Sequence, residues 1–207
     1  MKKVIVELFL LMVLAVVSSI IIYDKFGNTE KVIITEDENK FKTSYEQLNI
    51  DKKFINIRID DNNGVEYIDI DKFEELLKSE SAIIFIGTSE SNTSRNVIDS
   101  LFKALNKSDI SKLYYYDIAS NFESKEINDK KIDVLIDNTS ELKKLLTLLN
   151  RDKDNIYMPT VVFIKNKNIV GMHLGVLENI KDDNKELSKD QRQELTNIYL
   201  KNIDKIK

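Results

Sequence analysis

The only proline of the 207-residue chain, Pro159, stands directly before the apolar run Thr160 to Ile164. Proline has no N–H to donate to a sheet, so it is tolerated at the first residue of a strand or at a sheet edge, but not inside a sheet. Its ring fixes φ at about −65°, and an X–Pro bond adopts the cis form far more readily than other peptide bonds. Pro159 therefore predicts a buried strand that follows it and a fixed backbone turn at the start of that strand, with a cis bond as one way to form the turn.

Composition excludes several classes of protein. Hydrophobic residues make up 42% of the chain and charged residues 32%, which suffices for a core and a well-solvated surface. The net charge is −4 with both signs interspersed, so no basic face indicates nucleic-acid binding. Cysteine is absent, and the chain therefore has no disulfide, no thiolate nucleophile and no cysteine metal site.

The N-terminus carries a long apolar run, Val4 to Tyr23, which only Glu7 and Ser18–Ser19 interrupt. Roughly 20 residues at ~1.5 Å each span the ~30 Å hydrocarbon layer of a bilayer. The run continues through the two serines, so residues 1–23 fit an uncleaved signal-anchor better than a cleaved signal peptide. Two lysines precede the run and place the N-terminus in the cytoplasm. The remainder of the chain is then expected outside the membrane.

Glu7 suggests a second interpretation of this segment. A glutamate early in an apolar N-terminal helix resembles the type IV pilin-like proteins, but no glycine precedes Glu7 where their processing site requires one. A carboxylate near the membrane edge, neutral or reaching toward the headgroups, is the simpler interpretation, since insertion scales put an intramembrane charge at only about 3 kcal/mol.

Polar residues follow the apolar run. Residues 24–49 contain a single short β-like run, Lys31 to Thr35, and we interpret them as a stalk between the membrane and a domain. Residues 54–59 and 65–70 then alternate with period two around a turn signal, which predicts a β-hairpin. Asp71 follows as the cap of a short helix. The predicted domain covers 50–207, with the hairpin and helix in 50–80 and the core in 81–207.

From residue 81 strands and helices alternate. The continuous apolar run Ala82 to Ile86, which Gly87 ends, predicts a strand buried on both faces. The apolar residues between Val97 and Leu105 recur at helical spacing and predict a helix. The same patterns predict strands at 113–118, 160–164 and 169–173, a turn at 165–168, and helices at about 140–150 and 188–206.

This order of elements resembles the thioredoxin-like fold, an α/β fold with a central mixed sheet flanked by helices. The resemblance is strongest where Ile83 to Gly87 runs into a helix, and where Met158–Pro159 leads into a strand and a hairpin, as in the cis-proline strand of that family. The continuation Ile169 to Gly175 is more specifically similar to the bacteriocin transport accessory proteins, which are small and thioredoxin-like. The match covers about residue 81 to the C-terminus.

The resemblance implies a Cys-x-x-Cys at the start of the helix after the first strand, usually followed by a basic residue. Counted from Gly87 and anchored on Arg95, that tetrad falls on Ser91-Asn92-Thr93-Ser94, so both cysteine positions are serine. Thiol–disulfide exchange needs a thiolate to attack and another to leave, and a hydroxyl supplies neither. We therefore predict that the protein is redox-inactive and is not a thiol–disulfide oxidoreductase.

Other site chemistries have weak signals. A serine nucleophile needs an adjacent base, and the sole histidine, His173, lies in a predicted strand that nothing in the sequence places beside the serines. Helix capping is the favoured role for Ser91 to Ser94, because Ser, Asn and Thr accept bonds from free N–H groups at helix starts. Asp60–Asp61 and Asp182–Asp183 lack EF-hand spacing and are interpreted as solvated turns. We expect no catalytic residue, no metal and no cofactor.

Binding is the function that remains. In thioredoxin-like proteins the residue before the cis-proline offers its backbone to an extended peptide, a form of strand addition. Met158 holds that position here, and its flexible thioether suits varied partners. The predicted contact surface is a groove between Ser91-Asn92-Thr93-Ser94 and Met158–Pro159. The alternative is a vestigial groove whose residues only pack the fold.

The function expected from these features is that of a binding or accessory factor. The protein would be held in the cell membrane by a single span, with its C-terminal domain extracytoplasmic, and would bind a protein or peptide partner in the export or maturation of secreted peptides or proteins. The alternative is a structural or envelope-assembly protein that uses the domain as a scaffold.

Overall fold

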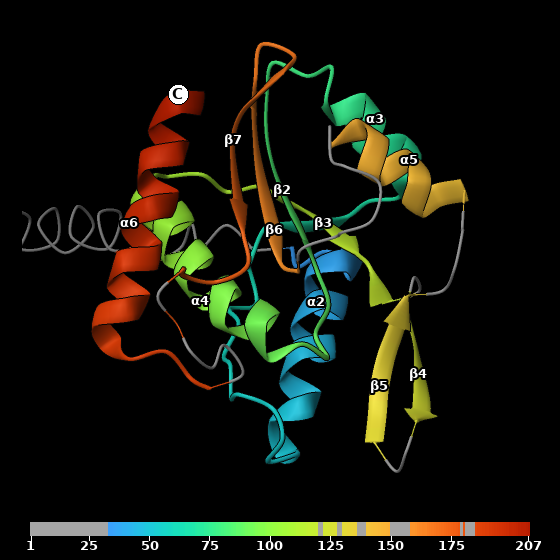
Figure 1. Ribbon diagram of the computed structural model, residues 1–207. Coiled ribbons are helices and arrows are strands. Elements are labelled where there is room, and N and C mark those ends of the chain that lie inside the picture. Colours follow the sequence, from blue (N-terminus) through green and yellow to red (C-terminus); the bar gives the residue numbers. More distant parts are fainter. Residues whose placement is uncertain are drawn as a thin grey trace, which may run out of the picture. The chain divides into compact units, whose positions relative to one another are not determined.

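A five-stranded mixed sheet forms the centre of the domain in the computed structural model (Figure 1). The structure describes residues 33–119, 122–127, 130–135, 140–149, 158–178, 180 and 185–207. The predicted membrane span and the first part of the predicted stalk, up to residue 32, lie outside these ranges. Within them, no helix combines the length and the apolar character that crossing a bilayer requires.

The order of the strands in the sheet is β1-β3-β2-β6-β7. Strands β1, β3 and β2 run parallel to one another, whereas β6 is antiparallel to β2 and β7 is antiparallel to β6. This topology confirms the predicted α/β thioredoxin-like fold in its general form. The strands are β1 (Val65–Tyr67), β2 (Ser81–Gly87), β3 (Leu113–Asp117), β6 (Thr160–Lys165) and β7 (Asn168–Leu174).

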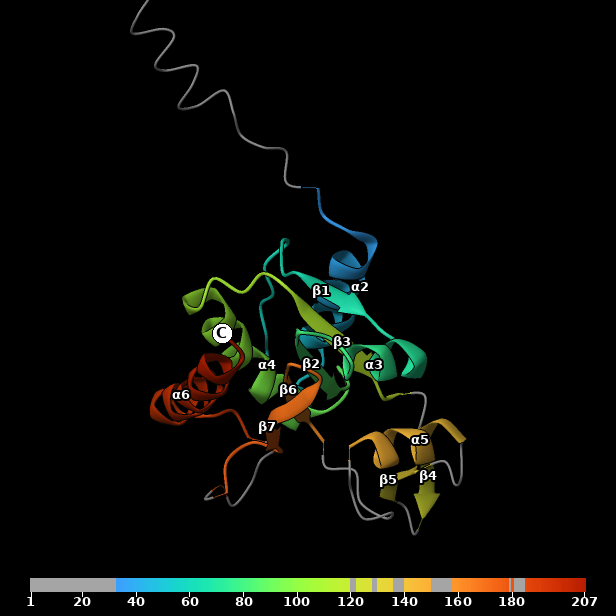
Figure 2. The same ribbon diagram turned by 90° about the horizontal axis from the view of Figure 1, so that it is seen from above.

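Helices cover both faces of the sheet, as Figures 1 and 2 show. Ile83 and Phe85 of β2 pack in one buried cluster with residues of α2, α4 and α6, and Ile84 and Ile86 pack in a second cluster with residues of α3 and α5. Both faces of β2 are therefore buried, which explains its continuous apolar run. The helices are α2 (Glu36–Glu46), α3 (Ile70–Leu76), α4 (Asn92–Lys107), α5 (Ser140–Leu148) and α6 (Lys189–Ile206).

The prediction of a stalk over residues 24–49 is wrong for residues 36–49. Helix α2 and the short 3-10 helix η1 (Gln47–Ile50) belong to the folded domain. Thr35 and Glu38 form a capping box at the start of α2, in which each side chain bonds the backbone N–H of the other residue. Phe41 and Tyr45, one helical turn apart, are fully buried, and the Phe41 ring centroid lies 4.9 Å from that of Tyr115 on β3. Two aromatic residues thus dock a helix that is otherwise polar.

The predicted hairpin of residues 54–59 and 65–70 does not form. Strand β1 pairs in parallel with β3, and residues 55–60 belong to no helix or strand. The period-two pattern still describes the burial, since Ile57 and Ile59 are buried while Asn56 and Arg58 are exposed. The backbone of this segment finds its partners in side chains instead of a second strand. Helix α3 also begins earlier than predicted, with Asp69 as its cap.

The remaining elements of the core follow the prediction closely. The Met158–Pro159 bond is cis, and the two-residue turn between β6 and β7 has positive φ at Asn166 (49°) and Lys167 (65°), as expected for a hairpin turn of type I′. One element was not foreseen. An antiparallel hairpin of β4 (Phe122–Ile127) and β5 (Lys130–Leu135) lies between β3 and α5 in the chain and forms a separate two-stranded sheet.

Candidate functional site

The register of β2 against β6 places the two halves of the predicted groove at one edge of the sheet. Ile86, near the end of β2, pairs with Thr160, the first residue of β6. The loop that leads to α4 and the cis Met158–Pro159 bond therefore start from neighbouring positions. Pro159 itself is buried, and its carbonyl accepts a hydrogen bond of 2.7 Å from the N–H of Gly175, which holds the turn before β6 in place.

Ser91 begins α4 as its N-cap, and this confirms the predicted capping role for that residue. Its Oγ accepts from the N–H of Ser94 at 3.3 Å and lies 2.6 Å from Oγ1 of Thr93. Ser91 and Thr93 are half-buried. Ser94 is completely buried, and its Oγ accepts from the N–H of Thr88 at 3.3 Å. Ser94 is therefore part of the packing beneath the loop and not of its surface.

Asn92 bridges α4 to the segment before it in the chain. Its Nδ2 donates to the carbonyl of Lys53 and its Oδ1 accepts from the N–H of Ile55, both at 2.8 Å. Both ends of the amide are thus used inside the domain. Of the six predicted groove residues, only Ser91, Thr93 and Met158 combine partial exposure with side chains that these internal contacts leave accessible.

His173 lies on β7, the edge strand, where its interactions are structural. Its Nε2 is 2.7 Å from the carbonyl oxygen of Val176, and its ring meets Tyr199 edge-on at 5.2 Å between centroids. Burial lowers the pKa of His173, and the bond to Val176 opposes that shift. No hydrogen bond joins this imidazole to a serine among the residues described, so the structure provides no activated hydroxyl.

The acidic pairs give no metal site in the part of the chain that the structure describes. No group of three or more His, Cys, Asp or Glu side chains there could hold an ion. Asp61 lies 3.5 Å from the ammonium of Lys42, and Asp182–Asp183 fall outside the described residues.

Arg95, which the sequence suggested only as the basic residue after the tetrad, is a central structural residue. Its side chain is 1% exposed, and it donates to the carbonyl oxygens of Ile55, Tyr45 and Ser89 at 2.5, 2.9 and 3.2 Å and to Oδ1 of Asn49 at 2.6 Å. No carboxylate among the described residues forms an ion pair with it, and burial lowers the pKa of its guanidinium. The planar guanidinium satisfies acceptors on three separate segments at once.

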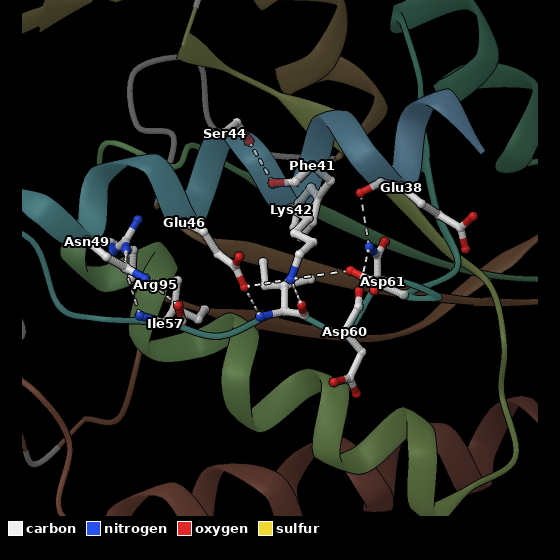
Figure 3. Close-up of polar contacts among 12 residues, drawn as sticks. Glu38, Phe41, Lys42, Ser44, Glu46, Asn49, Ile57, Asp60, Asp61 and Arg95 are labelled. Carbon is white, nitrogen blue, oxygen red and sulfur yellow. Dashed lines mark hydrogen bonds and ion pairs between the residues drawn. The ribbon is translucent and has the colours of Figure 1, made fainter. Parts of the chain in front are cut away.

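Side chains of α2 and η1 bond the backbone of the same segment (Figure 3). Asn49 receives the N–H of Ile57 at 3.0 Å and donates to its carbonyl at 2.7 Å. Glu46 accepts from the N–H of Ile59 at 2.7 Å, and Lys42 donates to the Ile59 carbonyl and to Glu46. The sequence pattern did not reveal this network. The capping box at Thr35–Glu38 was the available signal for the helix that carries it.

Comparisons with known proteins assign no function to the chain. No protein-family model matches the chain, and no curated protein matches it. Solved thioredoxin structures align at low identity. Thioredoxin f2 of Chlamydomonas reinhardtii is 16% identical, with 54% of this chain and 84% of that chain covered and a TM-score of 0.36. Thioredoxin of Trypanosoma brucei brucei is 12% identical, with 73% and 99% covered and a TM-score of 0.41.

The chemistry open to this site follows from its residues. The frame of a thioredoxin-like domain is present, but the chain has no cysteine, so its own side chains cannot carry out thiol–disulfide exchange. The position of the first cysteine holds a helix cap and that of the second holds a buried serine. The half-exposed residues at this edge can offer hydrogen bonds and apolar contact to a ligand.

Proposed function

We propose that the domain binds an extended segment of a peptide or protein partner at the edge formed by Met158–Pro159 and the start of α4. The single observation that carries this proposal is the state of the Met158 backbone. Among the described residues, none forms a hydrogen bond with its N–H or its carbonyl, although the neighbouring Pro159 carbonyl is bonded to Gly175. An N–H and a carbonyl that lack a partner among the described residues, beside the first residue of a strand, suit strand addition by an extended peptide.

The surroundings of Met158 support the same assignment. Its side chain is half-buried and packs against the cluster that contains Ile86 and Val162. An unbranched thioether in that position gives an adaptable apolar contact. Ser91 and Thr93 supply hydroxyl groups on the α4 side of the edge. A partner would therefore meet backbone groups and methionine on one side and hydroxyls on the other.

We further propose that the apolar residues 4–23 anchor the protein in the cell membrane with the domain on the extracytoplasmic side. In that setting the domain would act as an accessory factor in the export or maturation of secreted peptides or proteins, in line with the similarity of Ile169 to Gly175 to the bacteriocin transport accessory proteins. Protease accessibility of the domain in intact and permeabilised cells tests the orientation. Protection in intact cells and digestion after permeabilisation would contradict it.

Site-specific photo-crosslinking tests the binding edge. A benzophenone amino acid in place of Met158 should give a defined adduct with a partner in cells. The same replacement of Met172, a half-buried methionine that packs in the same cluster but lies on β7, is the matched control and should give none. Equal yields from both positions, or no adduct from position 158, would argue instead for a domain that serves as a scaffold.

A separate assay tests the absence of redox catalysis. The purified protein should not accelerate the reduction of insulin by dithiothreitol above the rate without protein. Any acceleration would show that a chemistry other than cysteine exchange operates here, since the chain contains no thiol.

A further inference from the structure

Residues 55–59 belong to no strand of the sheet, but their backbone hydrogen bonds and their side-chain burial alternate as in an extended chain. The N–H and the carbonyl of Ile55, Ile57 and Ile59 are all bonded, and every partner is a side chain. Successive residues of an extended chain direct their backbone groups to opposite edges. One edge of this segment is therefore fully bonded from within the domain. Figure 3 shows Asn49 bonded to the backbone of Ile57.

The opposite edge of the segment has no backbone partner in the part of the chain that the structure describes. Asn56 and Arg58 are exposed, and their backbone N–H and carbonyl groups form no hydrogen bond with any residue that the structure describes. A hollow of about 260 Å³ opens beside residues 55–58, and Asp99 and Lys103 of α4 line its other side. An extended strand that presents unpaired backbone groups is a template for a further strand. Here the template lies on a different segment from Met158–Pro159.

The charges around the hollow favour an acidic ligand. Lys103 pairs with Asp99 at 2.6 Å and Arg192 pairs with Glu186 at 2.8 Å, so these four charges are matched within the domain. Arg58, by contrast, is exposed on the free edge and forms no ion pair with a described residue. It is the cation that an incoming carboxylate can pair with directly.

We propose that the outward edge of residues 55–59 binds an acidic peptide segment by strand addition, with a carboxylate of the peptide paired to Arg58. The peptide would exchange N–H···O=C bonds with Asn56 and Arg58, the two residues whose backbone faces outward. This surface is separate from the edge at Met158, and it binds whether or not that edge does.

The internal hydrogen bonds of residues 55–59 lower the entropic cost of binding a peptide at their outward edge. A free strand loses conformational entropy when it is ordered against a ligand. Residues 55–59 are already extended, because Asn49, Glu46 and Lys42 hold one half and Asn92 and Arg95 hold the other. The buried side chains of Ile57 and Ile59 also fix which edge faces outward. The conformational entropy of residues 55–59 is therefore lost when the domain folds and not when the peptide binds.

Fluorescence anisotropy of the full chain in detergent micelles tests the proposal, with a labelled heptapeptide of alternating valine and glutamate as the probe. Saturable binding is expected, together with slower amide hydrogen exchange at Asn56 and Arg58. Exchange at Ile57 and Ile59 should be slow already in the free protein and unchanged by the peptide, because their N–H groups are bonded internally. Binding without this alternation, or no binding, would overturn the proposal.

Four variants separate the contributions. Arg58→Glu should weaken the acidic probe about tenfold or more and favour a valine–lysine peptide, whereas Lys107→Glu, the same charge reversal at the exposed end of α4, should change affinity little. Asn56→Pro removes an outward N–H without touching an internal bond and should also weaken binding. A cooperative thermal unfolding transition of Asn56→Pro would confirm that this variant folds. If Arg58→Glu bound the acidic probe with unchanged affinity, the proposed site would be refuted. Met158→Asp should leave this affinity unchanged, which distinguishes the two surfaces.

Discussion

Replacement of Arg95 by methionine should strongly destabilise the domain, although the sequence suggests Arg95 only as the basic residue after the tetrad. Methionine keeps much of the length of the side chain but supplies no donor. The carbonyl oxygens of Tyr45, Ile55 and Ser89 would then lose their bonds from the guanidinium, and Asn49 would keep only its bonds to the backbone of Ile57.

The magnitude follows from the burial of these groups. A buried acceptor left without a donor costs about 1–3 kcal/mol, and bonds from a charged donor lie at the upper end of the scale. Removing a buried cation also relieves its desolvation penalty, which is several kcal/mol and offsets part of the loss. With three carbonyls affected and Arg95 only 1% exposed, we expect a net loss of about 3–5 kcal/mol in the free energy of unfolding.

Urea unfolding followed by circular dichroism measures this loss. At a slope of about 2 kcal/mol per molar urea, the midpoint should fall by about 2 M. Arg192→Met is the matched control, because Arg192 makes a surface ion pair with Glu186, and such pairs contribute less than about 1 kcal/mol. If Arg95→Met lies within about 1 kcal/mol of the unmodified protein, the buried guanidinium does not hold the three segments together and the reasoning fails.

Three further predictions concern other contacts of the domain. Phe41→Ala should cost about 3–5 kcal/mol of unfolding free energy, because the ring is fully buried, and a value near zero would restore the stalk interpretation. Ser91→Ala should cost about 1 kcal/mol in the same urea assay and Ser91→Asp should not, since aspartate also caps; equal losses would refute a capping role. The pKa of Glu46 is lowered, because the Ile59 N–H and Lys42 outweigh the opposing effect of burial. Its stabilisation is present above the unfolded pKa of about 4.3 and is lost as pH falls through the lower folded value, so urea unfolding between pH 6 and 3 should show a shallower decline for Glu46→Gln.

The sheet and its helices were predictable because their signals are local and strong. The apolar run of β2 indicates burial on both faces, and the helix caps Ser91 and Ser188 stand where the apolar periodicity begins. Pro159 marks the start of β6, and Asn166–Lys167 form the tight turn after it. Each of these features depends on a few neighbouring residues and not on contacts between distant parts of the chain.

The segments before β2 were not predictable in the same way. Helix α2 has only two fully buried aromatic residues, Phe41 and Tyr45, so its pattern reads as polar, and the alternation at 54–59 is the same for a hairpin strand and for an isolated extended segment. What distinguishes these cases is the partner of the backbone. Asn49, Glu46 and Lys42 come from 8 to 17 positions away in the sequence, and Arg95 from 40, and no periodicity reports such pairings.

The residues that face the predicted groove could be predicted only in part from the sequence, for a related reason. A pattern match assigns Ser91-Asn92-Thr93-Ser94 to one surface, but a helix start turns successive side chains in different directions. Ser94 points into the packing beneath the loop, and Asn92 turns toward Lys53 and Ile55. The start of α4 carries no thiol, and its side chains connect the helix to neighbouring segments by hydrogen bonds. Its N-cap Ser91 lies near the edge at Met158, while Asn92 and Arg95 bond the backbone of Ile55. The start of α4, which carries no cysteine, thus has a structural role in this domain.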